Sequence, residues 1–281
     1  MDITPIVIAI ISLVASITVA GFGAYLNYST VERKARREAE QLLQKYRDPL
    51  LFAAEDLQSR LWGIFHTDVL SFSGRSVHHD DALYIYTAFV LGQFLAWTHI
   101  LRSQTQLLPF SLEEDQRLQK FLITLHNIQG VLLLSGTTES TAFTLWRGNQ
   151  MAIGEFMTEV RDSEKMCMGF HDFTKIWKGA SNDAHDDLHY WFDPVVVGLK
   201  TLAEKGPDVA EGNKLRRLQH LLVDLIEVLD PQKRRLQKGP IGPCGAASDC
   251  PCTRCRPLVH EPKAKKLGGR SSWWTKNSEI V

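Results

Sequence analysis

The stretch IVIAIISLVASITVAGFGAYLNY, residues 6–28, decides how this chain is organised, because it holds no Lys, Arg, Asp, Glu or His. A helix of this length spans roughly 34 Å at about 1.5 Å per residue, enough to cross a hydrocarbon core about 30 Å thick. The sequence therefore predicts one transmembrane helix. A cleaved signal peptide is the alternative, but it would have a basic start and a shorter apolar run, whereas the early charge here is Asp2.

Basic residues directly after this segment predict its orientation. Arg33, Lys34, Arg36 and Arg37 follow it, whereas residues 1–5 contain no Lys or Arg. Basic flanks stay on the cytoplasmic side of a membrane. We therefore expect a single-pass protein with its N-terminus outside and its C-terminal domain in the cytoplasm.

Small residues repeat every four positions along the apolar segment, at Ser12, Ser16, Ala20 and Ala24. Such a repeat stacks small side chains on one helix face and lets two helices approach closely, which would support a homodimer. The alternative is that Ser, Ala and Gly are common in transmembrane helices without any pairing.

Charge separates an acidic body from a basic C-terminal tail. Residues 231–281 hold 11 Lys and Arg but 3 Asp and Glu, out of 32 of each in the chain. On a membrane protein this charge favours anionic lipid or an acidic partner over nucleic acid. We expect a short extracytoplasmic N-terminus at 1–5, a transmembrane helix at 6–28, a charged helical stalk at 29–47, an all-α globular domain at 48–230 and a disordered basic tail at 231–281.

Helical spacing of apolar residues predicts that the domain is a helical bundle, with no β-hairpin. Asp48-Pro49 and Asp193-Pro194 are each expected to end one helix and to cap the next. Residues 82–101 lack Lys, Arg, Asp and Glu and are predicted to form a buried central helix. A second membrane span is the alternative there, which the polar side chains disfavour. Residues 146–160 and 215–229 are also expected to be helical.

Three long stretches resemble a known family: YRDPLLFAAEDLQSRLWGIF at 46–65, FVLGQFLAWTHILR at 89–102 and LWRGNQMAIGEFM at 145–157. Through them the chain is similar to a family of hypothetical proteins found in fungi, plants and bacteria. That family has no assigned reaction, substrate or catalytic residue. The resemblance implies that residues 46–230 form one unit and implies no activity.

The cluster NDAHDDLH at 182–189 is the most metal-like pattern in the chain. On a helix His185 and His189 lie one turn apart, and His171-Asp172 upstream would complete the set of a metal-dependent hydrolase. The alternative is a solvated helix start, where Asp and His often gather. We favour the solvated start, and the sequence predicts no bound metal and no cofactor.

Four cysteines near the C-terminus, Cys244, Cys250, Cys252 and Cys255, form a second candidate cluster. They offer enough donors for one tetrahedral zinc ion. Lipidation and unmodified reduced thiols are the alternatives. With five cysteines in the whole chain, no disulfide-dependent fold is indicated.

Several polar residues lie on the expected helices, and we expect them to form a structural hydrogen-bonded network or to line a pocket. They are Arg60, Arg147, Gln150 and Glu155. We favour the network, because no nucleophile or cofactor motif accompanies them.

Common catalytic motifs are missing from the sequence, which lacks a P-loop, a Gly-x-Ser-x-Gly elbow and a His-Glu-x-x-His zinc motif. The sequence predicts a membrane-anchored binding or scaffolding module with an unknown protein partner and no nucleic acid. An enzyme is less expected than a binding module, and the metal-dependent hydrolase using His171, Asp172, His185 and His189 is the alternative.

Overall fold

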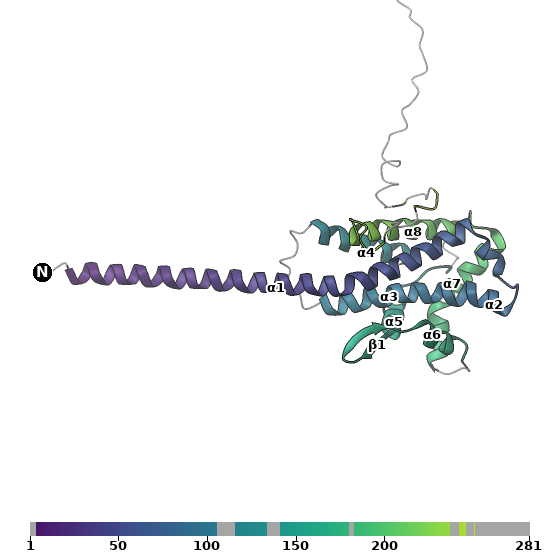
Figure 1. Ribbon diagram of the computed structural model, residues 1–281, viewed down its shortest axis with the longest axis horizontal. Helices are drawn as coiled ribbons and strands as arrows, with labels where there is room; N and C mark the ends of the chain where they lie inside the picture. The colour runs from purple at the N-terminus through teal and green to yellow at the C-terminus, as the bar shows by residue number, and fades with distance from the viewer. Residues whose placement is uncertain are drawn as a thin grey trace, which may run out of the picture.

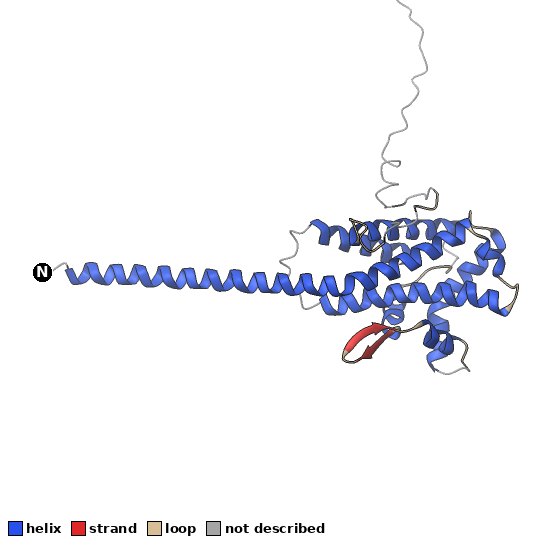
Figure 2. Ribbon diagram, in the orientation of Figure 1, coloured by secondary structure: helices blue, strands red, loops and turns tan. Residues whose placement is uncertain are grey.

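The computed structural model describes residues 4–105, 116–133, 141–179, 183–236, 242–245 and 250. It consists of helices with one small sheet, which confirms the prediction of a mainly α-helical domain (Figures 1 and 2). The helices are α1 Thr4–His66, α2 Val77–Asp80, α3 Tyr86–Thr105, α4 Gln116–Leu133, α5 Arg147–Phe156, α6 Phe170–Trp177, α7 Asp183–Lys205 and α8 Ala210–Leu229. A 3₁₀-helix, η1 Asp68–Phe72, and a π-helix, η2 Asp81–Ile85, lie between α1 and α3.

The core of the bundle lies between the C-terminal part of α1 and the two helices that pack on it, α3 and α8. In addition, α4 packs on α8 and α5 packs on α3. Leu50, Leu57 and Leu61 of α1 are buried and share one face of the helix. Because full burial of one leucine side chain contributes about 1.5–3 kcal/mol, this face fixes α1 in the bundle.

Helix α1 runs through Pro49 without a break, so the prediction that Asp48-Pro49 ends one helix and starts another was wrong. Proline inside a helix removes one hydrogen bond and costs about 3 kcal/mol. Buried side chains on both sides of it, Tyr46 and Leu50 among them, offset that cost. The Asp48 carboxylate binds arginine side chains and so does not act as a cap. The stalk predicted at 29–47 and the first helix of the domain are therefore parts of one continuous helix, α1.

Helix α7 likewise continues through Pro194, where the sequence predicted a new helix start. The Pro194 carbonyl accepts a hydrogen bond from the backbone N–H of Phe143 at 2.7 Å. The Phe143 ring lies against Gly198, one turn further on, where a methyl group would come within 2.5 Å of the ring. Close packing of the 141–146 segment on α7 thus stabilises a helix that local sequence would interrupt.

The apolar segment at 82–101 forms η2 and most of α3, and its side chains are largely buried, as predicted for a central helix. Within the part of the chain that the structure describes, Val77–Gln104 is the stretch long and apolar enough to cross a membrane by length and composition. However, 72% of its most apolar window is buried inside the bundle. The described contacts are those of a core helix.

The N-terminal part of α1 extends away from the bundle as a single long rod (Figure 1). The described side chains between 13 and 28 are exposed, large apolar ones such as Leu13, Val19 and Phe22 included. The transmembrane helix expected at 6–28 stays a prediction, and the exposure of these side chains is the observation that bears on it.

One β-hairpin replaces the end of the helix predicted at 146–160, so the expectation of no hairpin was wrong. Strands β1 Thr158–Arg161 and β2 Glu164–Cys167 pair antiparallel across Asp162 and Ser163. Both turn residues have positive φ, 50° and 65°, as a tight hairpin of this length requires. Figure 2 shows the hairpin beside the bundle, where Lys45 of α1 pairs with Glu164 at 2.7 Å.

Arg60 joins α1 to the π-helix through several hydrogen bonds. This confirms the prediction that Arg60 belongs to a structural hydrogen-bonded network. Its guanidinium donates to the carbonyls of Ala82 at 2.6 Å and Leu83 at 3.1 Å, and to the Thr87 hydroxyl at 2.8 Å. It also lies 5.3 Å from the centroid of the Tyr86 ring. One side chain therefore satisfies carbonyl groups at the irregular start of α3.

Replacing Arg60 with methionine should lower the free energy of unfolding by about 2 kcal/mol, because the carbonyl of the buried Leu83 and the hydroxyl of the buried Thr87 would lose their charged donor. Urea denaturation of the full chain in neutral detergent, followed by far-UV circular dichroism, measures this loss. The exposed Arg75 offers the control, and Arg75→Met should change little. Equal stability of the two variants would contradict a stabilising role for Arg60.

Candidate functional site

A cavity of about 700 Å³ is lined by residues near the end of α3 and the start of α4. Figure 1 shows these helix ends at the end of the bundle from which α1 departs. Four helices or their ends contribute to its wall. The lining residues are Gln44, Arg47 and Leu50 of α1, Leu101 of α3, Arg117, Leu118 and Phe121 of α4, Val228 and Leu229 of α8, and Asp230, Pro231, Gln232, Arg234 and Arg235 after it.

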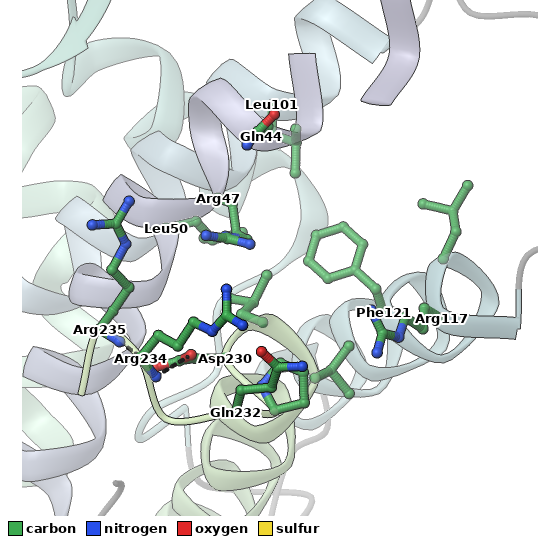
Figure 3. A pocket seen from close by; sticks show the side chains of 14 residues that line it. Gln44, Arg47, Leu50, Leu101, Arg117, Phe121, Asp230, Gln232, Arg234 and Arg235 are labelled. Atoms are coloured by element: carbon green, nitrogen blue, oxygen red, sulfur yellow. Dashed lines mark hydrogen bonds between the residues drawn. The ribbon is translucent and has the colours of Figure 1, made fainter. Parts of the chain in front are cut away.

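Four of these residues are arginines, and we call this space the arginine cavity. Figure 3 shows the guanidinium groups of Arg47 and Arg234 pointing toward each other across it. Arg117 approaches from α4 on the far side, next to Phe121. Residues far apart in the sequence therefore bring positive charge to one space.

The arginines after α8 are held by a short turn, residues 230–236, which we call the strap. The Asp230 carboxylate accepts hydrogen bonds from the backbone N–H groups of Arg234 and Arg235, each at 2.9 Å (Figure 3), and from that of Leu236 at 3.0 Å. Desolvation raises the pKa of Asp230, but these N–H groups and the Arg47 charge outweigh it and lower the pKa below its ordinary value. The charged carboxylate thus fixes the strap.

A second carboxylate ties the strap to α1. Asp48 lies 2.8 Å from the Arg235 guanidinium and 3.2 Å from that of Arg47. Asp230 is the one acidic side chain among the lining residues, and Asp48 lies beside them. Four guanidinium groups against two carboxylates leave the site with an excess of positive charge.

Replacing Asp230 with asparagine should speed hydrogen exchange of the Arg234, Arg235 and Leu236 amides by about tenfold, because one neutral oxygen cannot replace two charged ones. In the unaltered chain the pKa of Asp230 is lowered by folding. Its contribution is therefore fully present above the ordinary aspartate pKa of about 3.9 and is lost as the pH falls further.

Mass spectrometry of exchanged amides measures this change in the full chain. Asp187, which is exposed on α7, provides the matched control, and Asp187→Asn should leave strap exchange as it is. Unchanged protection of the three strap amides in Asp230→Asn would show that this carboxylate does not hold the strap.

Apolar side chains form the rest of the cavity wall. They are Leu50 of α1, Leu101 of α3, Leu118 and Phe121 of α4, and Val228 and Leu229 of α8. Guanidinium groups bind phosphate and carboxylate oxygens in pairs. The cavity therefore suits a ligand with an anionic group and an apolar part.

The strap differs from the prediction of a disordered tail beginning at 231. Residues 231–236 contact α1 through Arg235, and residues 242–245 and 250 contact α8. The tail residues from 251 onward, with Cys252 and Cys255, lie outside the described residues. Charge alone does not distinguish a bound strap from a solvated tail, because both are rich in Lys and Arg.

The structure brings His185 and His189 together on α7, with ring centroids 4.3 Å apart. The His189 Nε2 atom lies 3.1 Å from the Trp177 carbonyl, and Asp172 on α6 lies 3.6 Å from Arg161. His171 is exposed at the start of α6. Among the described residues, no group of three or more His, Cys, Asp or Glu is arranged to hold a metal ion.

Gln150 takes part in the structural network that the sequence predicted. Its side-chain amide donates to the carbonyls of Leu145 at 2.8 Å and Gln129 at 3.2 Å. Arg147 donates to the Gln129 side chain at 3.3 Å, whereas Glu155 is exposed. These contacts join α5 to α4 and lie apart from the arginine cavity.

Two of the four clustered cysteines are buried against α8. Cys244 is 2% exposed and Cys250 is 4% exposed. Burial raises the pKa of the Cys244 thiol to about 11, which disfavours the thiolate that acylation needs. The lipidation hypothesis therefore applies best to Cys252 and Cys255.

The predicted pairing face is exposed on α1 at Ser16, Ala20 and Ala24. The side chain of Ser12 lies outside the described residues. This exposure leaves the face accessible to a second helix, and pairing stays a prediction.

The sequence did not single out the arginine cavity, because its residues gain meaning only when α1, α4 and the strap meet. The clearest hint was Arg234-Arg235 directly after the end of α8. Comparison of the chain with protein-family models, curated proteins and solved structures returned no match.

Proposed function

We propose that this protein is a single-pass membrane protein whose cytoplasmic helical domain binds an anionic amphiphile in the arginine cavity. The observation that carries this proposal is the meeting of Arg47, Arg117 and Arg234 around one space with an apolar wall. A volume of about 700 Å³ falls within the usual range for small-molecule sites.

The chemistry of the wall defines the ligand class. A phosphate or carboxylate group would accept hydrogen bonds from two guanidinium groups at once, and such charge-assisted bonds are roughly twice as strong as neutral ones. An apolar part would lie on Leu101 and Phe121. A purely inorganic anion would leave this apolar surface in contact with water.

The membrane part of the proposal rests on α1. Exposed apolar side chains such as Leu13, Ile17 and Phe22 suit a hydrocarbon environment. Arg33, Lys34 and Arg37 follow them along the same helix and favour a cytoplasmic, anionic membrane surface. From Tyr28 to Gln44 a helix rises about 24 Å, so tilting of α1 brings the arginine cavity toward that surface.

A homodimer through Ser12, Ser16, Ala20 and Ala24 forms part of the same proposal, as does a protein partner for the domain. Small residues on one face of α1 favour close approach of two membrane helices. Such pairing would present two arginine cavities side by side at one membrane.

Binding measurements on the full chain in neutral detergent test the ligand class. The probes are dihexanoyl phosphatidic acid, dihexanoyl phosphatidylcholine and inorganic phosphate. We expect the anionic lipid to bind at least about tenfold more tightly than the zwitterionic lipid, because phosphatidylcholine carries a compensating cation.

Inorganic phosphate separates the two possible sources of the anion. The proposal requires phosphate to bind more weakly than phosphatidic acid, since it cannot use the apolar wall. Phosphate binding as tightly as the lipid, or equal binding of both lipids, would contradict an amphiphile site.

A further inference from the structure

Charge around the arginine cavity indicates how many negative charges its ligand brings. Among the residues that the structure describes, four arginines line the cavity, and the carboxylates on or beside its wall are Asp48 and Asp230. Despite desolvation, the pKa of Asp230 lies below its ordinary value, because backbone N–H groups donate to it, so this carboxylate is ionised at neutral pH. The described site therefore has an excess of two positive charges.

A smaller cavity of about 320 Å³ adjoins the arginine cavity, since Asp230 and Pro231 line both. It is lined by two further cations, Lys120 and Lys233, and by one further carboxylate, that of Glu227. These neighbouring charges add to the positive excess and do not cancel it.

Asp48 shows how one carboxylate is bound among these arginines. Its Oδ1 atom accepts hydrogen bonds from Nε and Nη2 of Arg47, each at 3.2 Å, and its Oδ2 atom lies 2.8 Å from Nη2 of Arg235. A single negative charge with two oxygens thus serves two guanidinium groups, and the positive excess remains. A ligand carboxylate or phosphodiester, each with one charge and two terminal oxygens, would again leave one positive charge without a counterion.

Three guanidinium groups reach the cavity from different elements, that of Arg47 from α1, that of Arg117 from α4 and that of Arg234 from the strap (Figure 3). A phosphomonoester has three terminal oxygens, one for each guanidinium group, and carries about two negative charges near pH 7. Its hydrogen bonds to arginine are charge-assisted and so roughly twice as strong as neutral ones. Charge and acceptor number therefore both favour a phosphomonoester over other anionic groups.

We propose that the ligand of the arginine cavity is an amphiphile with a phosphomonoester head group. The dianionic head group lies between Arg47, Arg117 and Arg234. This inference rests on the proposed function, because it specifies the head group of the same ligand. Arg117 determines the preference for a phosphomonoester, since two of the three guanidinium groups and one excess positive charge remain without it.

Titration calorimetry on the full chain in neutral detergent at about pH 7.5, where a phosphomonoester is mostly doubly ionised, tests the head group. The probes are the dihexanoyl forms of phosphatidic acid, phosphatidylglycerol and phosphatidylcholine, which have the same acyl chains. We expect phosphatidic acid to bind at least about tenfold more tightly than phosphatidylglycerol, a phosphodiester with one charge.

Glycerol 3-phosphate separates a lipid from a soluble source of the phosphomonoester. It has the same head group without acyl chains, so it should bind more weakly than phosphatidic acid. Equal binding of the two would assign the cavity to soluble phosphomonoesters and overturn the amphiphile.

Arg117→Gln tests the residue that sets the preference. In this variant the affinity ratio of phosphatidic acid to phosphatidylglycerol should fall below about threefold, because the third guanidinium group is gone. Arg75→Gln, at an exposed position that does not line the cavity, is the matched control and should keep the tenfold ratio. Circular dichroism should show the same helix content in both variants.

The outcomes separate this inference from the proposed function. Equal binding of phosphatidic acid and phosphatidylglycerol, with both tighter than phosphatidylcholine, would overturn the phosphomonoester head group and leave an anionic-amphiphile site. Equal binding of all three lipids would overturn both. A tenfold ratio that persists in Arg117→Gln would overturn the arrangement of three guanidinium groups around the head group.

Discussion

Replacing Gly212 with alanine should lower the free energy of unfolding by at least about 3 kcal/mol, the upper end of the range for overpacked sites. Gly212 lies in the first turn of α8, where the chain from Pro207 folds back over it. A methyl group there would lie 1.9 Å from the Pro207 carbonyl oxygen. Because this neighbour is backbone, the whole entry to α8 has to move.

Gly148→Ala supplies the matched control for this prediction. Gly148 lies in the first turn of α5, and an added methyl group would meet nothing within 4 Å. Because alanine has a higher helix propensity than glycine, this substitution should leave the free energy of unfolding unchanged or raise it by up to about 1 kcal/mol. Urea denaturation of both variants measures the difference, and equal stabilities would mean that the turn before α8 yields without cost.

Replacing Lys214 with methionine should stabilise the domain near pH 7 by about 3 kcal/mol and remove a pH dependence of stability. Lys214 is buried in α8, where its ammonium group donates to the Thr144 hydroxyl at 3.1 Å. Burial, followed by the nearby Arg217 charge, lowers the pKa of Lys214 from 10.5 to about 7.

The sign of this effect follows from proton binding. Between pH 7 and 10.5 the unfolded chain holds a proton on Lys214 that the folded chain releases, so stability rises with pH across this interval. Below pH 7 both states are protonated, and the folded chain bears the full cost of the buried charge.

Urea denaturation at several pH values compares the unaltered chain with Lys214→Met. Subtracting the two curves removes the contribution of all other titrating groups. Lys200→Met, at an exposed position of α7, should give a curve parallel to that of the unaltered chain. Parallel curves for Lys214→Met as well would contradict a burial-lowered pKa.

The helices with regular apolar spacing were the most predictable part of the fold. The pattern at 215–229 corresponds to α8, whose buried residues Leu218, Leu222 and Leu225 follow the expected face. The segment at 82–101 was predictable for the same reason, because a long uncharged stretch with polar side chains needs a protein interior.

Local sequence rules failed where tertiary packing opposed them. Pro49 and Pro194 both begin a helix by local preference, yet each lies inside one, held by buried neighbours before and after it. The hairpin around Asp162-Ser163 has strands of four residues, too short to show alternation. Neither outcome follows from a window of a few residues.

The arginine cavity was unpredictable for a related reason. Arg47 belongs to α1 and Arg234 to the strap, and the two are 187 positions apart. In the sequence each is one basic residue among many in a solvated stretch. Only the packing of α8 against α1, with Asp48 and Asp230 as fixed points, gives them a common space.

The most direct test is the dissociation constant of dihexanoyl phosphatidic acid for Arg47→Gln/Arg234→Gln, measured by titration calorimetry on the full chain in neutral detergent. The matched control is Arg75→Gln/Lys205→Gln, which also removes two positive charges, at exposed positions that do not line the cavity. We predict at least about 100-fold weaker binding for the cavity variant, from the loss of charge-assisted hydrogen bonds, and less than about threefold for the control. Equal affinities of the two double variants would contradict binding in the arginine cavity.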